Sequence, residues 1–373
     1  MSLTACGGGG PGATPPSPSQ SGAAVGVVSG LGSVIVNGIR FDDGTARVVD
    51  DDGTPRSTAD IRLGMTVAIA SGPVTPPSGD APGQATATRI TYGSSVAGRV
   101  TARNLVSTPP TLTVAGQTVL VPAGTVIVGS TTGVNGISTS DLIEVHALAD
   151  PATQRYFATR IERRTDLSEC KVVGTALGVD TALKAFVLGG LTVDYTGASV
   201  AGLTEGARVQ VKLALNSADN SCTNLATRVT ALSPTTTEGA QTTLEGHISD
   251  YTSNASFKIN GIPVQASSTV GGLGNGVRVL AEGLVQSGVL VTNQIAVRNP
   301  LASRDVRLFG TGSAVDPLNQ TVTLRGVTVL YATALFENGA SLSSLDDGAR
   351  LDVQGQFESN GQRLIATRVR REN

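Results

Sequence analysis

The sequence of 373 residues contains no tryptophan, and aromatic residues make up only 3% of it. Sites for nucleic-acid bases or sugars commonly stack aromatic rings on the ligand, so this scarcity argues against both. The formal net charge of -2 offers no basic surface for nucleic acid or anionic lipid, and we expect no nucleic-acid partner. No run of 18 or more apolar residues occurs, so no membrane-spanning helix is predicted.

Histidine occurs only at His146 and His247, which leaves little material for acid–base catalysis or metal binding. Each follows a glutamate by two residues, so Glu144 and His146, like Glu245 and His247, share one face of a strand. The two pairs lie far apart in the chain, whereas zinc needs three or four ligands. No Gly-x-Ser-x-Gly motif occurs. We therefore predict that both histidines lie at the surface or have hydrogen-bond partners, and that the protein has no metal, no cofactor and no enzymatic activity. An envelope hydrolase is a third possible function, after the two non-enzymatic functions given below.

Cysteine is also scarce, with one residue near the N-terminus and two further along, Cys170 and Cys222. These two lie within one stretch of the chain, and export to an oxidising compartment permits a disulfide between them. Two free thiols and a metal pair are the alternatives, and the metal pair is disfavoured because no other cysteine or histidine is near in sequence. The disulfide requires Cα atoms within about 7 Å of each other.

Residues 3–6, Leu-Thr-Ala-Cys, are similar to a bacterial lipobox, in which small residues precede the cysteine that receives lipid. We assign residues 1–6 to the remnant of a lipoprotein signal and residues 7–23, rich in Gly, Pro and Ser, to a disordered, solvated tether. Lipid on Cys6 would anchor the protein in the membrane. Because Gly7 rather than aspartate follows, we expect an outer-membrane lipoprotein of the bacterial cell envelope, facing the periplasm or the cell surface.

Internal repetition dominates the remaining chain. A glycine in a short first strand is followed by a hairpin with Asn-Gly or a similar pair, which suits a turn with positive φ at both central residues. A turn and a closing Ala-Thr-Arg strand come next. The first glycines are Gly26, Gly98, Gly174, Gly246 and Gly310, the hairpin glycines Gly38, Gly116, Gly190, Gly261 and Gly326, and the closing arginines Arg89, Arg160, Arg228 and Arg368.

This pattern predicts an all-β protein of five tandem repeats, each a small barrel of about five strands. The order of strands, hairpin, turn or short helix and two final strands matches an OB-like barrel, whereas a sandwich would show about seven strands. The repeats are 24–93, 95–164, 171–232, 243–299 and 306–371. Because the connections between them are short, we expect an elongated array.

The closing strand of the second repeat illustrates the expected core. Alternation places Phe157, Thr159 and Ile161 on the inward face, and Ala158 and Arg160 on the outward face. We therefore expect the four closing arginines, Arg89, Arg160, Arg228 and Arg368, to point outward. They would form an interaction ladder along the array for an acidic envelope polymer, or each would pair with a neighbouring carboxylate and cover apolar surface with its stem.

Three acidic clusters carry a glycine directly after them, at residues 42–44, 50–53 and 346–348. A calcium loop places aspartates at alternating positions and a glutamate later, and none of the clusters has that spacing. Asp-Gly is common in turns. We therefore predict turns at these positions, with a weak calcium site as the alternative.

The repeat residues, behind a lipobox, resemble a bacterial envelope family called domain of unknown function 5666, whose members often occur as tandem copies in Gram-negative lipoproteins. The fourth copy departs from the pattern, with Thr292-Asn293-Gln294 at the place of Ala-Thr-Arg. The family has no assigned activity, so the resemblance implies location and architecture only. We expect a non-enzymatic, lipid-anchored envelope protein that acts as a structural or interaction module for an unknown protein or envelope polymer. An adhesion or ligand-binding lipoprotein that uses its inter-strand loops is the alternative.

Overall fold

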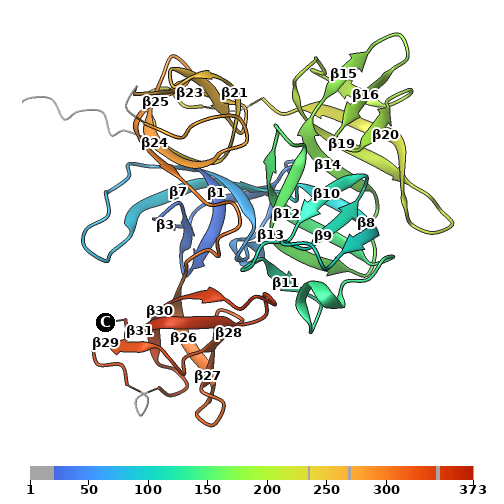
Figure 1. Ribbon diagram of the computed structural model, residues 1–373. Coiled ribbons are helices and arrows are strands. Elements are labelled where there is room, and N and C mark those ends of the chain that lie inside the picture. Colours follow the sequence, from blue (N-terminus) through green and yellow to red (C-terminus); the bar gives the residue numbers. More distant parts are fainter. Residues whose placement is uncertain (1–20, 234–235, 268–269, 342–344, 373) are drawn as a thin grey trace, which may run out of the picture.

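The computed structural model describes residues 21–233, 236–267, 270–341 and 345–372 (Figure 1). Regular structure within these residues is β-strand, apart from two 3-10 turns, Thr58–Asp60 (η1) and Gly133–Gly136 (η2). The predicted all-β class is confirmed, and the short helix considered between strands is at most a 3-10 turn. The described residues contain no helix long and apolar enough to cross a membrane. Cys6 and most of the predicted tether lie outside the described residues.

The strands form five groups, numbered here in chain order. Group 1 contains β1 (Gly22–Leu31), β2 (Val34–Val36), β3 (Ile39–Asp42), β4 (Arg47–Asp50), β5 (Pro55–Arg56), β6 (Thr66–Ser71) and β7 (Gly83–Tyr92). Group 2 contains β8 (Val96–Asn104), β9 (Thr111–Val114), β10 (Gln117–Leu120), β11 (Val126–Val128), β12 (Leu142–Asp150) and β13 (Arg155–Arg164). Group 3 contains β14 (Cys170–Thr175), β15 (Leu177–Asp180), β16 (Ala185–Leu188), β17 (Leu191–Asp194), β18 (Ser199–Ala201), β19 (Arg208–Leu215) and β20 (Cys222–Ala231). Group 4 contains β21 (Gln241–Ser253), β22 (Ser256–Ile259), β23 (Ile262–Ala266), β24 (Arg278–Gln286) and β25 (Val289–Val297). Group 5 contains β26 (Val306–Asp316), β27 (Thr321–Leu324), β28 (Val327–Leu330), β29 (Leu335–Glu337), β30 (Arg350–Phe357) and β31 (Leu364–Arg371).

Strand pairing closes these sheets into small barrels. In group 1, β1 pairs with β2, β2 with β3, β3 with β7, β7 with β6, and β6 with β1 again. The β3–β7 pair is parallel and the others are antiparallel. Corresponding circuits run through groups 2, 4 and 5. Closure leaves few free edges and lets aliphatic residues such as Val28 and Ile90 fill the interior.

The glycine of the first strand makes room for the hairpin of the same group. Asn37 and Gly38 both have positive φ, 54° and 82°, as the predicted tight hairpin requires. The Asn37 side chain lies over Gly26, where a Cβ would come within 2.4 Å of its Oδ1, and its amide donates to the carbonyl of Val25 at 3.0 Å. Asn260 repeats this contact in group 4, donating to the carbonyl of Glu245 at 2.8 Å.

The Ala-Thr-Arg motif of the closing strand forms a β-bulge. Ala70 and Ser71 of β6 face Arg89 and Ala87 of β7, so Thr88 between them has no register partner. The Thr88 hydroxyl donates to the carbonyl of Ala70 at 3.0 Å. The threonine hydroxyls of the other three Ala-Thr-Arg strands donate equivalent bonds to backbone carbonyls of the facing strand. Thr159 donates to the carbonyl of His146, Thr227 to that of Lys212 and Thr367 to that of Gln354. The motif is therefore explained by strand geometry alone.

This bulge overturns one prediction for β13. Tyr156, Ala158 and Ile161 belong to the core of groups 2 and 3, because the extra residue shifts the alternation of faces within the strand. Phe157 does not enter that core. Its ring stacks on His247 of group 4 with ring centroids 4.9 Å apart. The expectations that Phe157 points inward and Ala158 outward are wrong, because alternation was assumed to continue through the bulge.

The groups pack side by side, so the expectation of an elongated array is also wrong (Figure 1). Strand β1 pairs with β6 and β2 of its own barrel and also pairs with a neighbouring barrel at each end. Its first residues pair with β21 of group 4 in parallel, and Gly30 and Leu31 pair with β26 of group 5. Strand β8 similarly pairs with β14 of group 3. Backbone N–H and C=O groups on an unpaired edge of a long first strand can thus pair with strands of other barrels, including barrels distant in sequence.

The acidic cluster at residues 50–53 joins group 1 to group 3. Asp50 accepts from the backbone of Asp52 and Thr54, and Gly53 has a φ of 83°, as expected for a turn. Asp51 pairs with Lys171 at 2.8 Å, and Asp52 pairs with Lys212 of β19 at 2.7 Å. These aspartates therefore form contacts between groups 1 and 3 in addition to forming a turn.

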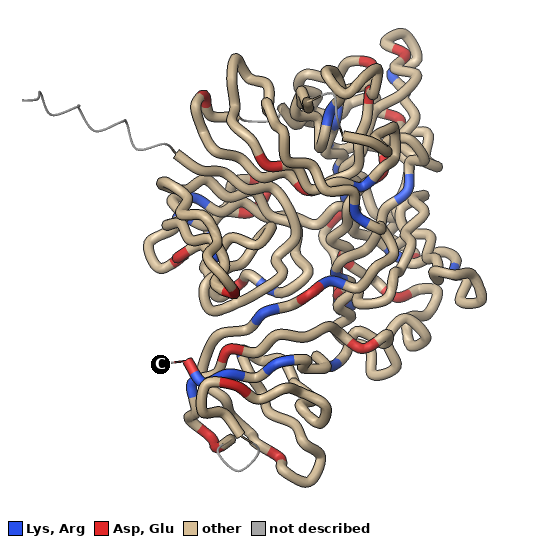
Figure 2. Tube along the Cα trace, turned by 60° about the vertical axis from the view of Figure 1, so that its left-hand side comes forward, with Lys and Arg blue, Asp and Glu red and all other residues tan. Residues whose placement is uncertain are grey.

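Among the described residues, charged residues of both signs are interspersed along the trace, with no extended region of one sign (Figure 2).

Candidate functional site

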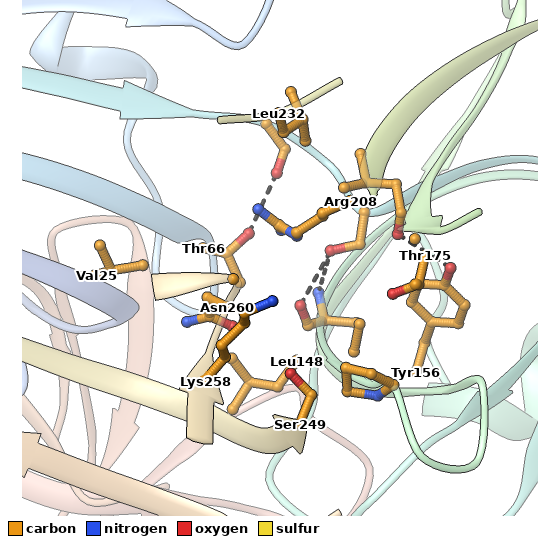
Figure 3. A pocket seen from close by; sticks show the side chains of 18 of the residues that line it. Val25, Thr66, Leu148, Tyr156, Thr175, Arg208, Leu232, Ser249, Lys258 and Asn260 are labelled. Atoms are coloured by element: carbon orange, nitrogen blue, oxygen red, sulfur yellow. Dashed lines mark hydrogen bonds between the residues drawn. The ribbon is translucent and has the colours of Figure 1, made fainter. Parts of the chain in front are cut away.

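A cavity of about 490 Å³ lies where groups 1, 2, 3 and 4 meet (Figure 3). No single barrel encloses it. Strand ends and turns from the four groups supply its walls, including residues 91–95 at the end of β7, the β12–β13 turn, the turn before β19, and β21 with β22. Its volume lies in the range of small-molecule sites, which are commonly found between domains.

Arg208 at the start of β19 faces this cavity (Figure 3). Its main chain is held in place, because its carbonyl accepts from the Leu232 amide at 2.7 Å and Thr175 is its register partner. Desolvation by nearby protein atoms lowers the pKa of Arg208, although Tyr156 and Asp51 act in the opposite direction. The side chain is nevertheless exposed and contributes to the cavity lining.

Tyr156 of β13 forms another part of the wall and connects groups 2 and 3. Its hydroxyl donates to the carbonyl of Val173 at 3.0 Å, and burial raises the pKa of the phenol. Gly174 makes this approach possible, because a Cβ there would lie 2.7 Å from the Tyr156 oxygen. The tyrosine is held as a neutral donor and positions the wall of the cavity.

The two histidines lie buried at contacts between groups. His146 Nδ1 accepts from the Thr66 amide at 3.3 Å, and burial is the main cause that lowers the pKa of His146 to about 3. His247 Nδ1 lies 3.2 Å from the carbonyl of Ala149, its pKa is also lowered by burial, and its Nε2 is buried without a partner among the described residues. Neutral, enclosed rings of this kind hold surfaces together and are poorly placed for proton transfer to a substrate.

Cys170 and Cys222 are joined in the structure, with an S–S distance of 2.01 Å and Cα atoms 5.7 Å apart. Their separation thus meets the geometric condition set from the sequence. The bridge packs against Gly98 of group 2, where a Cβ would meet the Cys222 sulfur at 2.6 Å. Gly98, the glycine of the first strand of group 2, therefore leaves room for the disulfide of group 3.

The four closing arginines do not share one exposed row. Arg160 has a side chain only 7% exposed, pairs with Glu162 at 3.1 Å and donates to the carbonyl of Leu63 in group 1. Another barrel covers Arg160, so it cannot serve in an exposed ladder, and its pairing with Glu162 matches the alternative expectation of a neighbouring carboxylate. Arg228 lies 3.7 Å from Asp52, and Arg368 pairs with Asp80 at 3.2 Å. Arg89 is exposed and donates to Thr91 at 3.4 Å.

Metal binding has little support in the described part of the chain, where histidine, cysteine, aspartate and glutamate form no group of three or more suited to a metal ion. Sequence analysis did not identify Arg208 or the cavity. Arg208 is not one of the four closing arginines, and nothing in its local sequence distinguishes it from a surface residue. Only the approach of groups 1, 2 and 3 brings it to the same cavity as Tyr156 and Asp51.

Comparison with known proteins supports the resemblance inferred from the repeats. Residues 97–162 and 310–370 match the family described as "Domain of unknown function (DUF5666)". The resemblance is confirmed for these two regions, consistent with a repeated domain of that family. No curated protein matches the chain. A solved structure titled "drosophila Unr CSD456" has 12% identity and a TM-score of 0.15, covering 75% of this chain and 98% of its own.

Proposed function

From the premise that two regions of this chain are DUF5666 domains, we propose that all five groups are copies of one OB-like repeat. The recurring circuit of five paired strands, the hairpin and the threonine bulge support this proposal. Group 3 follows the same circuit with its first strand divided into β14 and β15, since its hairpin strands β16 and β17 pair with β15 and β20. The proposed boundaries remain 24–93, 95–164, 171–232, 243–299 and 306–371.

The function that the geometry supports best is non-enzymatic ligand binding by a lipid-anchored protein of the bacterial cell envelope. The cavity between groups 1 to 4 carries this proposal, because it brings polar side chains from four repeats to one concave site. A hydrolase is disfavoured by the burial of both histidines in contacts between groups. The ligand would thus occupy a space between repeats, whereas the sequence alone suggested loops between strands.

Filling the cavity should abolish ligand retention. Ser249 lines it and lies three residues after Gly246, while Ser313, which is exposed on β26, occupies the same repeat position after Gly310. We expect native mass spectrometry of protein purified gently from its own cell envelope to detect a bound small molecule. The added mass should be present in the wild type and in Ser313→Phe and absent in Ser249→Phe. Absence of added mass from all three proteins, or equal retention by Ser249→Phe, would contradict the proposal.

Anchoring and outer-membrane location are proposed from the lipobox at residues 3–6, which lies outside the described residues. The membrane is then one partner through lipid on Cys6, and an envelope polymer or protein remains a further candidate. When the protein is expressed behind a complete signal sequence, it should partition into detergent, and Cys6→Ser should move it to the aqueous phase. A serine variant that stays in the detergent phase would refute lipidation at this residue.

A further inference from the structure

We infer that the cavity between groups 1 to 4 binds a small organic anion, whose carboxylate or phosphate group is held by Arg208 with Arg155 as a second cation. This inference rests on the proposed binding function and specifies the chemical class of the ligand. Both side chains contribute to the cavity lining. A guanidinium presents a planar fork of donors that matches the oxygen atoms of carboxylates and phosphates.

Charge pairing within the cavity leaves these two arginines without a partner. Of the carboxylates that line it, Asp51 binds Lys171 and Asp250 binds Lys258, each at 2.8 Å. The other two lining carboxylates are engaged as well: Glu245 binds Arg278 and Arg304, and Asp150 accepts from Ala152 and Thr153. Neither Arg155 nor Arg208 has a side-chain hydrogen bond or ion pair to any other described residue. The unsatisfied charge in the cavity is therefore positive.

Arg208 differs in this respect from the buried Arg160 and the half-buried Arg304. Burial lowers the pKa of both of these arginines, but each makes an ion pair with a glutamate. Arg208 makes no such ion pair, and its side chain is exposed at the cavity. An anion that enters the cavity from solvent can therefore reach this guanidinium without displacing a carboxylate from it.

The remaining walls indicate an anion with both hydroxyl and apolar parts. Thr66, Ser249 and Asn260 offer side-chain hydrogen-bonding groups, whereas Val25 and Leu148 offer aliphatic surface (Figure 3). A cavity of about 490 Å³ accommodates a molecule of the size of a sugar acid or a sugar phosphate. Inorganic phosphate and glucuronate are therefore suitable probes for the two oxyanion types.

Isothermal titration of the full chain with each probe at low salt tests the inference. At least one probe should bind the wild type, and binding should weaken as sodium chloride is raised. Arg208→Gln should weaken binding at least tenfold, with a smaller loss for Arg155→Gln. The matched control is Arg47→Gln, since Arg47 is exposed on β4, has no partner among the described residues and lies outside the cavity lining. It should bind as the wild type does.

A stability measurement separates the binding role from a structural one. If Arg208 only supported the fold, Arg208→Gln would unfold at a lower temperature, whereas removal of an exposed cation that makes no ion pair should leave the melting temperature unchanged. Failure of both probes to bind the wild type, or unchanged affinity in Arg208→Gln, would overturn the anion assignment. A neutral molecule retained by the wild type and lost in Ser249→Phe would leave the binding function intact while refuting the present inference.

Discussion

Replacement of Glu245 with glutamine should lower the free energy of unfolding by roughly 3–5 kcal/mol, the usual cost of removing one partner from a buried ion pair. Glu245 on β21 has a side chain only 6% exposed and lies between two arginines. Arg278 approaches it at 2.5 Å and Arg304 at 2.8 Å. Burial by itself would raise the pKa of Glu245, but the charges of Arg304 and Arg278 outweigh that effect and hold the pKa below its ordinary value.

Glutamine preserves the shape of Glu245 and removes its charge, so two largely buried guanidinium groups lose their counter-ion. Glu358→Gln is the matched control, because Glu358 forms a surface pair with Arg363, whose side chain is 46% exposed. That change should cost under about 1 kcal/mol. Urea denaturation followed by circular dichroism compares the two variants, and hydrogen exchange locates the loss at group 4. Equal stability of both variants would show that the Glu245 cluster contributes no more than a surface pair.

Loss of the Cys170–Cys222 bond should destabilise group 3 by about 4 kcal/mol in the chain-entropy model, since the bond spans a sequence separation of 52 residues. Cys170 begins β14 and is fully buried, and Cys222 begins β20. The link thus ties the first strand of the group to its last. Reduction, or replacement of both cysteines with alanine, should raise hydrogen exchange in β14, β19 and β20 far more than in group 5.

Thiol counting provides the direct measurement for this bond. In a Cys6→Ser background, protein isolated from an oxidising compartment should contain no thiol that reacts with a maleimide under native conditions. After denaturation and reduction, two thiols should react. The serine background serves as the control because it removes the one cysteine outside the pair. Full labelling of Cys170 and Cys222 without reductant would exclude the disulfide.

Much of the fold was predictable because the determinants are local and recur along the chain. An Asn-Gly pair favours its own tight turn, so residues 37–38 and 260–261 indicated hairpins before any contact was known. Short aliphatic runs between such turns indicated strands, and their order indicated small barrels. The threonine of Ala-Thr-Arg was visible as a repeated residue, but its bulge was missed because a bulge is recognised by the register of the facing strand.

By itself, the sequence determined the all-β class, the repetition, the hairpins and the pair of cysteines able to bridge. Only the tertiary structure decided that barrels distant in the chain pack together, that Arg160 is covered, and that Arg208 faces a cavity. The reason is that local turn and strand preferences act within one barrel, where they repeat and can be recognised. Contacts between barrels depend on which strand edges and charged side chains come together in space, as in the ion pair of Asp51 with Lys171. Such contacts leave no periodic pattern in the sequence.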